Sequence, residues 1–146
     1  MPTLMRLVNV ISRCGAMYRT EKFRDMHLCA PHHSYIFSVC RTPGITQEQL
    51  AEHICVDKSN VTRQLAHLEQ EGYVERRQSE TDKRVVQVYP TEKAREALPV
   101  VRETIGQWNE YVTQDLTPDE LETLMNAMEK VAVRARQYVR ETEASK

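Results

Sequence analysis

The stretch GITQEQLAEHICVDKSNVTRQLAHLEQEG, residues 44–72, decides the fold because it predicts two short helices joined by a tight turn. Thr46, with a glutamine three residues later, forms a capping-box pattern that predicts a helix over residues 47–54. Asp57 is a typical N-cap for a second helix, and Gly72 ends that helix where a left-handed backbone is favoured. Two helices joined this closely are typical of a helix-turn-helix.

The next segment, RRQSETDKRVVQVYP at residues 76–90, predicts a short β-hairpin in a chain that is otherwise helical. Its outer parts alternate β-branched and polar residues, as strands do, and its middle is too polar for the core. The hairpin carries four cationic side chains, Arg76, Arg77, Lys83 and Arg84. Such a hairpin is either a solvated loop or a finger that contacts an anionic partner.

Helical periodicity continues on both sides of this middle region. Apolar residues three and four apart predict a helix from residue 4 to about residue 25 and another over residues 33–40. Thr91 is placed to cap a long helix, and Thr117, followed by Pro118 and later by Glu120, begins the last one. The predicted fold class is mainly α (α+β), a winged helix-turn-helix with long N- and C-terminal helices.

The long apolar stripes of the terminal helices predict a dimer. We expect residues 1–42 and 92–146 to form an intertwined helical dimerisation region, and residues 43–91 to form the winged helix-turn-helix. The alternative is that the terminal helices simply pack on the core of their own chain.

The helix after Asp57 has one apolar and one polar face. Val61, Leu65 and Leu68 share the inward face, whereas hydroxyl, amide and guanidinium groups lie at the exposed N-terminal end. Such groups bind base edges and phosphates in a major groove, and a guanidinium on the hairpin tip, oriented by Asp82, suits a narrow minor groove. The predicted DNA-binding residues are Lys58, Ser59, Asn60, Thr62, Arg63, His67, Arg77, Asp82, Lys83 and Arg84. An ordinary solvated helix face is the alternative.

Residues 44–98 resemble the MarR (multiple-antibiotic-resistance regulator) family of winged-helix transcription regulators. DKSNVTRQLAHLEQEGYVER is similar to the family's recognition helix and first wing strand, and SETDKR to its wing tip. The resemblance implies a homodimer that binds a pseudo-palindromic operator in double-stranded DNA, as a repressor released by a small ligand or an oxidant. It places Ser59, Asn60, Thr62 and Arg63 in the major groove and Asp82 and Arg84 at the minor groove.

Three sensor hypotheses remain open. The resemblance implies an effector crevice, for which the candidate residues are Arg13, Met17, Tyr18, His33, Tyr35 and Phe37. Cys14, with Tyr18 one turn later, is similar to the reactive cysteine of peroxide-sensing family members, although a buried apolar role is the alternative. Soft ligands gather in the candidate metal set Cys29, His32, His33 and Cys40, which matches no closed zinc pattern.

Other classes of protein are disfavoured. No nucleophile elbow, phosphate-binding glycine loop or metalloprotease motif is present, so we expect no enzyme and no cofactor. A helical adaptor for a protein partner is the remaining rival, but it would show an outward apolar stripe on the second helix. The net charge of −1 means that any anion-binding face is local. With no signal-peptide pattern and no membrane-length apolar run, we expect a cytoplasmic protein.

Overall fold

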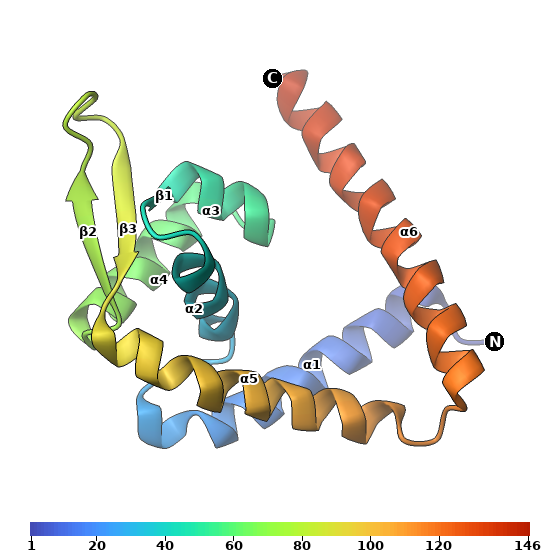
Figure 1. Ribbon diagram of the computed structural model, residues 1–146. Coiled ribbons are helices and arrows are strands. Elements are labelled where there is room, and N and C mark those ends of the chain that lie inside the picture. Colours follow the sequence, from blue (N-terminus) through green and yellow to red (C-terminus); the bar gives the residue numbers. More distant parts are fainter. The chain divides into compact units, whose positions relative to one another are not determined.

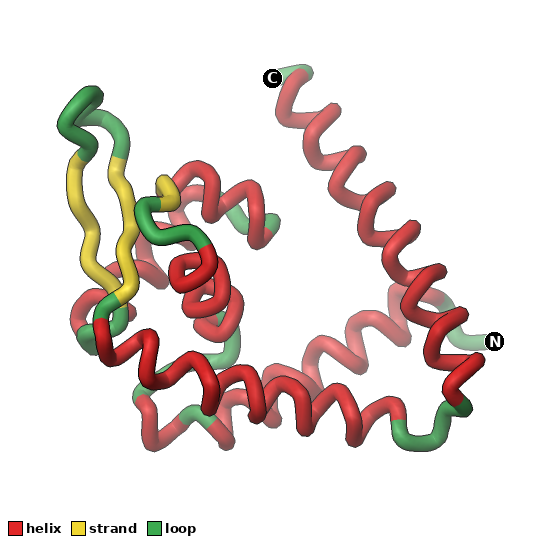
Figure 2. Tube along the Cα trace, viewed as in Figure 1, coloured by secondary structure: helices red, strands yellow, loops and turns green.

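The computed structural model describes residues 1–146 and is mainly helical, with one small antiparallel sheet (Figures 1 and 2). In chain order the elements are α1 Leu4–Lys22, the 3-10 helix η1 Arg24–Met26, α2 His32–Arg41, β1 Ile45–Thr46, α3 Gln47–Ile54, α4 Lys58–Gln70, β2 Val74–Gln78, β3 Val86–Pro90, α5 Glu92–Thr113 and α6 Pro118–Ala144. The predicted helix-turn-helix and hairpin are α3, α4, β2 and β3, so the winged-helix fold class is confirmed.

The helix-turn-helix begins and ends as the capping residues predict. Thr46 accepts a hydrogen bond from the Gln49 amide at 3.0 Å, and the Gln49 side chain accepts one from the Thr46 amide at 3.0 Å. This reciprocal pair satisfies two amides at the start of α3 that have no partner within the helix. Asp57 caps α4 by accepting a hydrogen bond from the Asn60 amide, and Gly72 takes φ +81° just after α4 ends. A side chain at Gly72 would be strained in that conformation.

The sheet has the strand order β1-β3-β2, and both pairings are antiparallel. In the hairpin, Arg76 faces Val88 and Gln78 faces Val86. On the other edge of β3, Ile45 faces Val88 and Thr46 faces Gln87. The sequence did not predict β1, because two residues carry no strand periodicity and their pairing joins segments more than forty residues apart.

α1 ends earlier than predicted, at Lys22 rather than near residue 25. Phe23 leaves the helical conformation and is fully buried in the core, and a 3-10 turn follows it. His27 then takes φ +58°, which reverses the chain toward α2. Burial of the Phe23 ring therefore outweighs continuation of an exposed helical turn.

One hydrophobic core joins parts of the chain that the sequence analysis had separated. It draws Tyr35, Ile36 and Val39 from α2, Leu65 and Leu68 from α4, Val88 from β3, and Ala94, Ala97 and Val101 from α5. Residues 1–108 form one compact unit and residues 109–146 form a second. The predicted division at residues 42/43 and 91/92 thus remains a prediction about dimerisation, since α2 and the start of α5 share the core of the winged helix.

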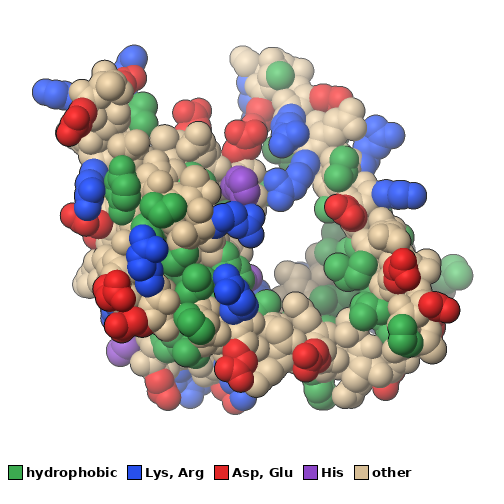
Figure 3. All heavy atoms as spheres, viewed as in Figure 1, with side chains coloured by type: hydrophobic (Ala, Val, Ile, Leu, Met, Phe, Trp, Pro, Cys, Tyr) green, Lys and Arg blue, Asp and Glu red, His purple; other side chains and the backbone are tan.

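The C-terminal unit contains a helix whose apolar residues are not buried. Thr117 and Glu120 form a capping box at the start of α6, with Pro118 at the first helical position, as predicted. No residue of α6 is buried, and its exposed apolar side chains, several of them visible in Figure 3, are Leu124, Met125, Met128, Val131, Val133, Tyr138 and Val139. None of the helices combines the length and apolar character that crossing a bilayer requires.

Candidate nucleic-acid interface

The N-terminus of α4 is held by the Asp57 carboxylate. Its Oδ1 accepts hydrogen bonds from the Asn60 amide and the Ser59 hydroxyl, each at 2.7 Å. These bonds, the Ser59 one first, lower the pKa of Asp57 below its ordinary value. The Ser59 oxygen keeps its lone pairs for an external donor, and the free amides of the first turn favour an anion nearby.

Behind this polar end, α4 is anchored in the core as predicted. Val61, Leu65 and Leu68 are all fully buried, whereas Thr62 and Arg63 are exposed. The face of α4 that carries the predicted base contacts is therefore turned outward, and the helix is too firmly packed to rotate that face inward.

Lys58, also predicted to contact DNA, pairs with a neighbouring carboxylate. Its Nζ lies 3.2 Å from Glu48 Oε1 of α3, and both side chains are at least three-quarters exposed, at 75% and 78%. Such an exposed ion pair contributes at most about 1 kcal/mol to stability. Lys58 can therefore exchange this carboxylate for a phosphate at small cost.

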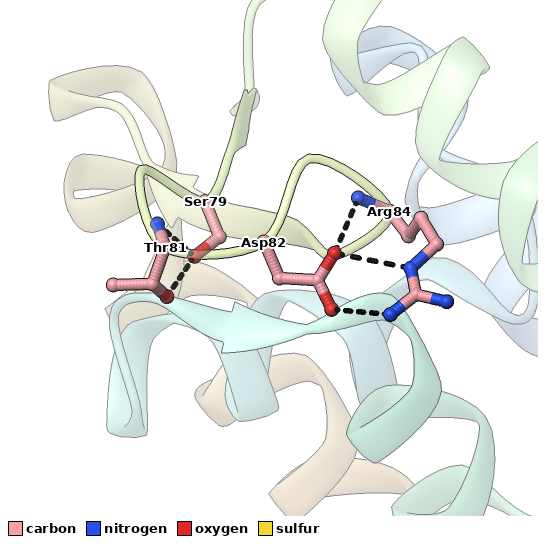
Figure 4. Close-up of polar contacts among 4 residues, drawn as sticks. All are labelled: Ser79, Thr81, Asp82 and Arg84. Atoms are coloured by element: carbon pink, nitrogen blue, oxygen red, sulfur yellow. Dashed lines mark hydrogen bonds and ion pairs between the residues drawn. The ribbon is translucent and has the colours of Figure 1, made fainter.

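The wing tip carries Arg84 in a fixed orientation (Figure 4). Asp82 accepts three hydrogen bonds from Arg84, at 3.0 Å from the backbone amide, 3.2 Å from Nε and 3.3 Å from Nη2. The side-chain bond and then the backbone bond lower the pKa of Asp82, so the carboxylate stays ionised. The Arg84 side chain is nonetheless 91% exposed. Asp82 thus restrains the guanidinium, which remains accessible to an external anion. Figure 3 shows cationic side chains projecting at this tip.

A second tie near the base of the hairpin joins the wing to α4. Glu69 accepts hydrogen bonds from the Arg76 amide at 3.0 Å and from Arg76 Nη2 at 3.0 Å. Arg77, predicted to contact DNA, donates to Glu75 at 2.9 Å and stacks over the Tyr89 ring at 4.4 Å. Glu69 was not predicted as a positioning residue; its place seven residues before Arg76, across a turn, was the only available signal in the sequence.

The helix-turn-helix and the wing enclose one hollow. A groove of about 340 Å³ is lined by Thr46, Gln47, Glu48, Lys58, Thr62, Arg84, Val85 and Val86. Gln47 donates to the Thr62 hydroxyl at 3.4 Å across it. The structure therefore brings Lys58, Thr62 and Arg84 to the same concave surface, which adds Gln47 to the predicted set.

His67 is placed differently from the other predicted DNA contacts. It is half-buried, its Nε2 lies 3.1 Å from the His27 carbonyl oxygen, and its ring stacks on His32 at a centroid distance of 4.9 Å. This side chain joins α4 to the connection between α1 and α2. A DNA contact by His67 therefore has no support from its geometry.

The predicted effector residues do not share one cavity within this chain. Tyr35 is only 1% exposed and lies in the core, where burial raises its pKa, so its assignment to an open crevice is wrong for the single chain. Met17 is exposed, and Tyr18 donates to the Thr104 carbonyl at 3.0 Å. His33 and Phe37 contact each other edge to face, with ring centroids 6.1 Å apart. Arg13 is exposed on α1.

The candidate cysteines likewise do not gather at one site. Cys14 is exposed on α1, while the Tyr18 ring packs on Trp108 at 5.0 Å. Cys40 is half-buried, and burial raises the pKa of its thiol, which disfavours the thiolate that binds metals. The structure groups Cys29 and His32 with His67, rather than with His33 and Cys40.

Comparisons with known proteins all point to one family. The model of the MarR family matches residues 28–86, which span α2, the helix-turn-helix and most of the wing. Over this segment the chain is similar to the MarR family. MarR-family proteins are transcription regulators and not enzymes, and the winged helix-turn-helix of this chain agrees with that family.

Individual MarR-family proteins are similar to this chain, in sequence or in structure, over most of their length. The uncharacterised HTH-type transcriptional regulator YybA of Bacillus subtilis (strain 168) is 28% identical over 131 residues, covering 90% of this chain and 87% of YybA. The crystal structure of the transcriptional regulator SlyA has a TM-score of 0.89 at 25% identity, over 93% of this chain and 96% of SlyA. A Listeria monocytogenes MarR-family structure solved with a 26mer DNA has a TM-score of 0.86 at 24% identity, over 97% and 96% of the two chains.

Proposed function

We propose that this chain is a homodimeric repressor that binds a pseudo-palindromic operator in double-stranded DNA. α4 enters the major groove, where Ser59, Asn60, Thr62 and Arg63 contact bases and phosphates. The wing enters the adjacent minor groove with Arg84. A small-molecule effector releases the protein from the operator.

The arrangement of Arg84 carries the DNA-binding part of this proposal. The Arg84 side chain is 91% exposed, yet its guanidinium donates two hydrogen bonds to Asp82 and its backbone amide donates a third, so it has already lost much of its conformational entropy. Insertion into a narrow groove of negative potential then costs less. Lys58 and Thr62 line the same groove as Arg84, so helix and wing contacts can form together.

The Listeria monocytogenes protein solved with a 26mer DNA shares this fold, which supports DNA as the ligand class. The exposed face of α4 argues in the same direction. A helix that docks on protein presents an apolar stripe, whereas the outward residues here are Ser59, Thr62 and Arg63. The apolar residues left exposed on α6 support the dimer, because a monomer in water would leave this stripe solvated.

The test is a selection from a random duplex library by wild type, Arg84→Ala and Arg24→Ala, each at two salt concentrations. Arg24→Ala is the matched control, because it removes the same charge from an exposed site on η1. We expect wild type and the control to enrich one palindrome, with half-sites about one helical turn apart, and Arg84→Ala to enrich it weakly. Affinity should fall steeply with salt as phosphate contacts release counterions. Equal enrichment by all three proteins would overturn the wing assignment.

A further inference from the structure

Three metal-ligating side chains meet outside the proposed DNA interface. Cys29 and His32 lie at the start of α2, and His67 lies in the last turns of α4. One ligand atom from each of the three residues lies within 4.8 Å of the other two. Cys29 is exposed, His67 is half-buried and His32 is fully buried, so the cluster opens to solvent at the thiol.

The hydrogen bonds of His32 fix its tautomer. The Cys29 backbone amide donates to Nδ1 at 2.8 Å, and a backbone amide can only donate, so Nδ1 carries no proton. Nε2 therefore carries the proton and donates it to Gln64 Oε1 at 2.8 Å.

His67 has the same tautomer when neutral. Its Nε2 lies 3.1 Å from the His27 carbonyl oxygen, which can only accept, so Nε2 donates and Nδ1 has a free lone pair. Both imidazoles thus present an unprotonated Nδ1 while an oxygen acceptor holds the opposite N–H. Metal-binding histidines commonly have such an acceptor behind the ring, which fixes its orientation and raises its basicity.

We propose that Cys29 Sγ, His32 Nδ1 and His67 Nδ1 bind one divalent transition metal of the zinc class per chain, with a fourth position open to solvent. The donor set decides the ligand class: one thiolate and two imidazoles suit Zn²⁺ and Co²⁺, whereas Mg²⁺ and Ca²⁺ require oxygen ligands.

Binding requires two changes in the cluster. The Cys29 thiol releases its proton to solvent, and the metal replaces the Cys29 amide as the partner of His32 Nδ1. The two rings, now stacked with 17° between their planes, must also splay apart, because a metal lies close to the plane of each imidazole it binds. The half-exposed His67 is the ring free to move.

Two nearby candidates do not belong to the site. His33 Nδ1 lies 3.0 Å from the Ala30 carbonyl oxygen, so this nitrogen is the protonated donor. Cys40 is half-buried and is not among the three grouped ligands. His33→Gln is therefore a matched control for His67→Gln, and Cys14→Ser, at another exposed cysteine, is a matched control for Cys29→Ser.

The test titrates reduced, metal-free full-length protein with Co²⁺ and then with Zn²⁺. We expect one metal per chain, with a sulfur-to-cobalt charge-transfer band in the near ultraviolet that Zn²⁺ displaces. Cys29→Ser should abolish the band, and His67→Gln should weaken Zn²⁺ binding more than about tenfold, the least that even an outer-shell partner costs. The two controls should bind as wild type does.

Absence of stoichiometric binding by wild type would overturn the site, as would a charge-transfer band that survives in Cys29→Ser. Both variants lie on accessible side chains, and circular dichroism would verify that they fold. If His67→Gln proved unfolded, the cobalt band of Cys29→Ser would decide alone. The readout needs no DNA, so it is independent of the proposed function.

Discussion

α4 and α6 are both amphipathic helices, but they bury their apolar faces in different ways. α4 places Val61, Leu65 and Leu68 in the core of its own chain, each fully buried. α6 is twice as long, yet none of its residues is buried. The winged helix is thus complete within one chain, whereas the apolar face of α6 requires a second copy in the proposed dimer. Stability and oligomeric state should accordingly respond to different substitutions.

The largest expected effect is on the association of α6. Leu124→Glu with Met128→Glu places two charges one helical turn apart on its apolar face. Two buried apolar side chains contribute together about 3–6 kcal/mol, so we expect the dimer dissociation constant, measured by sedimentation equilibrium, to rise by more than about a hundredfold. Glu122→Gln, on an exposed position of α6, is the control. An unchanged constant would show that α6 is not the dimer interface.

Truncation of the α4 core should give the next largest effect. Leu65→Ala removes a fully buried side chain and should lower the free energy of unfolding by about 2–5 kcal/mol, measured by urea denaturation. Ala66→Ser, on the exposed side of the same helix, should change it by less than about 0.5 kcal/mol. A small effect of Leu65→Ala would mean that the winged helix also depends on the partner chain for its core.

Substitutions on the outward face of the winged helix should change DNA affinity and leave the dimer intact. Arg63→Ala and Arg84→Ala should each cost about 1–3 kcal/mol of operator binding, measured by fluorescence anisotropy. The Arg84 loss should be similar on any duplex, because a minor-groove guanidinium reads mainly shape and potential. The Arg63 loss should depend on sequence. Two losses with the same sequence dependence would contradict the division between helix and wing.

Removal of the capping box of α3 should lower the free energy of unfolding by a smaller amount. Thr46→Ala removes the acceptor for the Gln49 amide and should lower the free energy of unfolding by about 1 kcal/mol. The measurement is again urea denaturation. Thr142→Ala, on the exposed end of α6, should change it much less, although its hydroxyl also donates within a helix. Equal effects would indicate that the box is not needed to begin α3.

Peroxide should have the smallest effect of all. Cys14 is exposed on α1, but Tyr18 donates to the Thr104 carbonyl and packs on Trp108. We therefore expect wild type and Cys14→Ser to bind the operator equally, before and after peroxide treatment. A peroxide-induced loss of affinity that Cys14→Ser abolishes would establish Cys14 as the redox sensor.

Local signals predicted much of this molecule. Thr46, Asp57 and Thr117 marked the helix starts correctly, because a cap depends on residues only three positions away. The alternation of the hairpin predicted its strands for the same reason. The end of α1 was not predictable, since it depends on the burial of Phe23 against distant residues.

In the candidate site, too, features that depend on nearby residues were predicted, and features that depend on distant contacts were not. Ser59, Thr62 and Arg84 were predicted to be exposed from their positions on a helix and a turn, and they are exposed. Their DNA contacts remain predictions, and His67 was assigned to DNA from its place on the helix alone. Its contact with the His27 carbonyl joins residues forty positions apart, so the local sequence around neither residue indicates it. Tyr35 was likewise assigned to an open crevice, although α2 turns its ring into the core.

Thr46 has a consequence for how affinity can be regulated. It belongs to β1, opposite Gln87 of β3, and it also caps α3. The Gly44 amide, two residues earlier, donates to the Val88 carbonyl at 2.8 Å. Strand β3 of the wing and the helix-turn-helix are therefore joined through one short segment. This connection would keep the proposed major-groove and minor-groove contacts of one subunit at a fixed offset. In the proposed dimer, an inducing signal would therefore change the distance between the two winged helices rather than the structure of either one. That distance has to match the spacing of the operator half-sites.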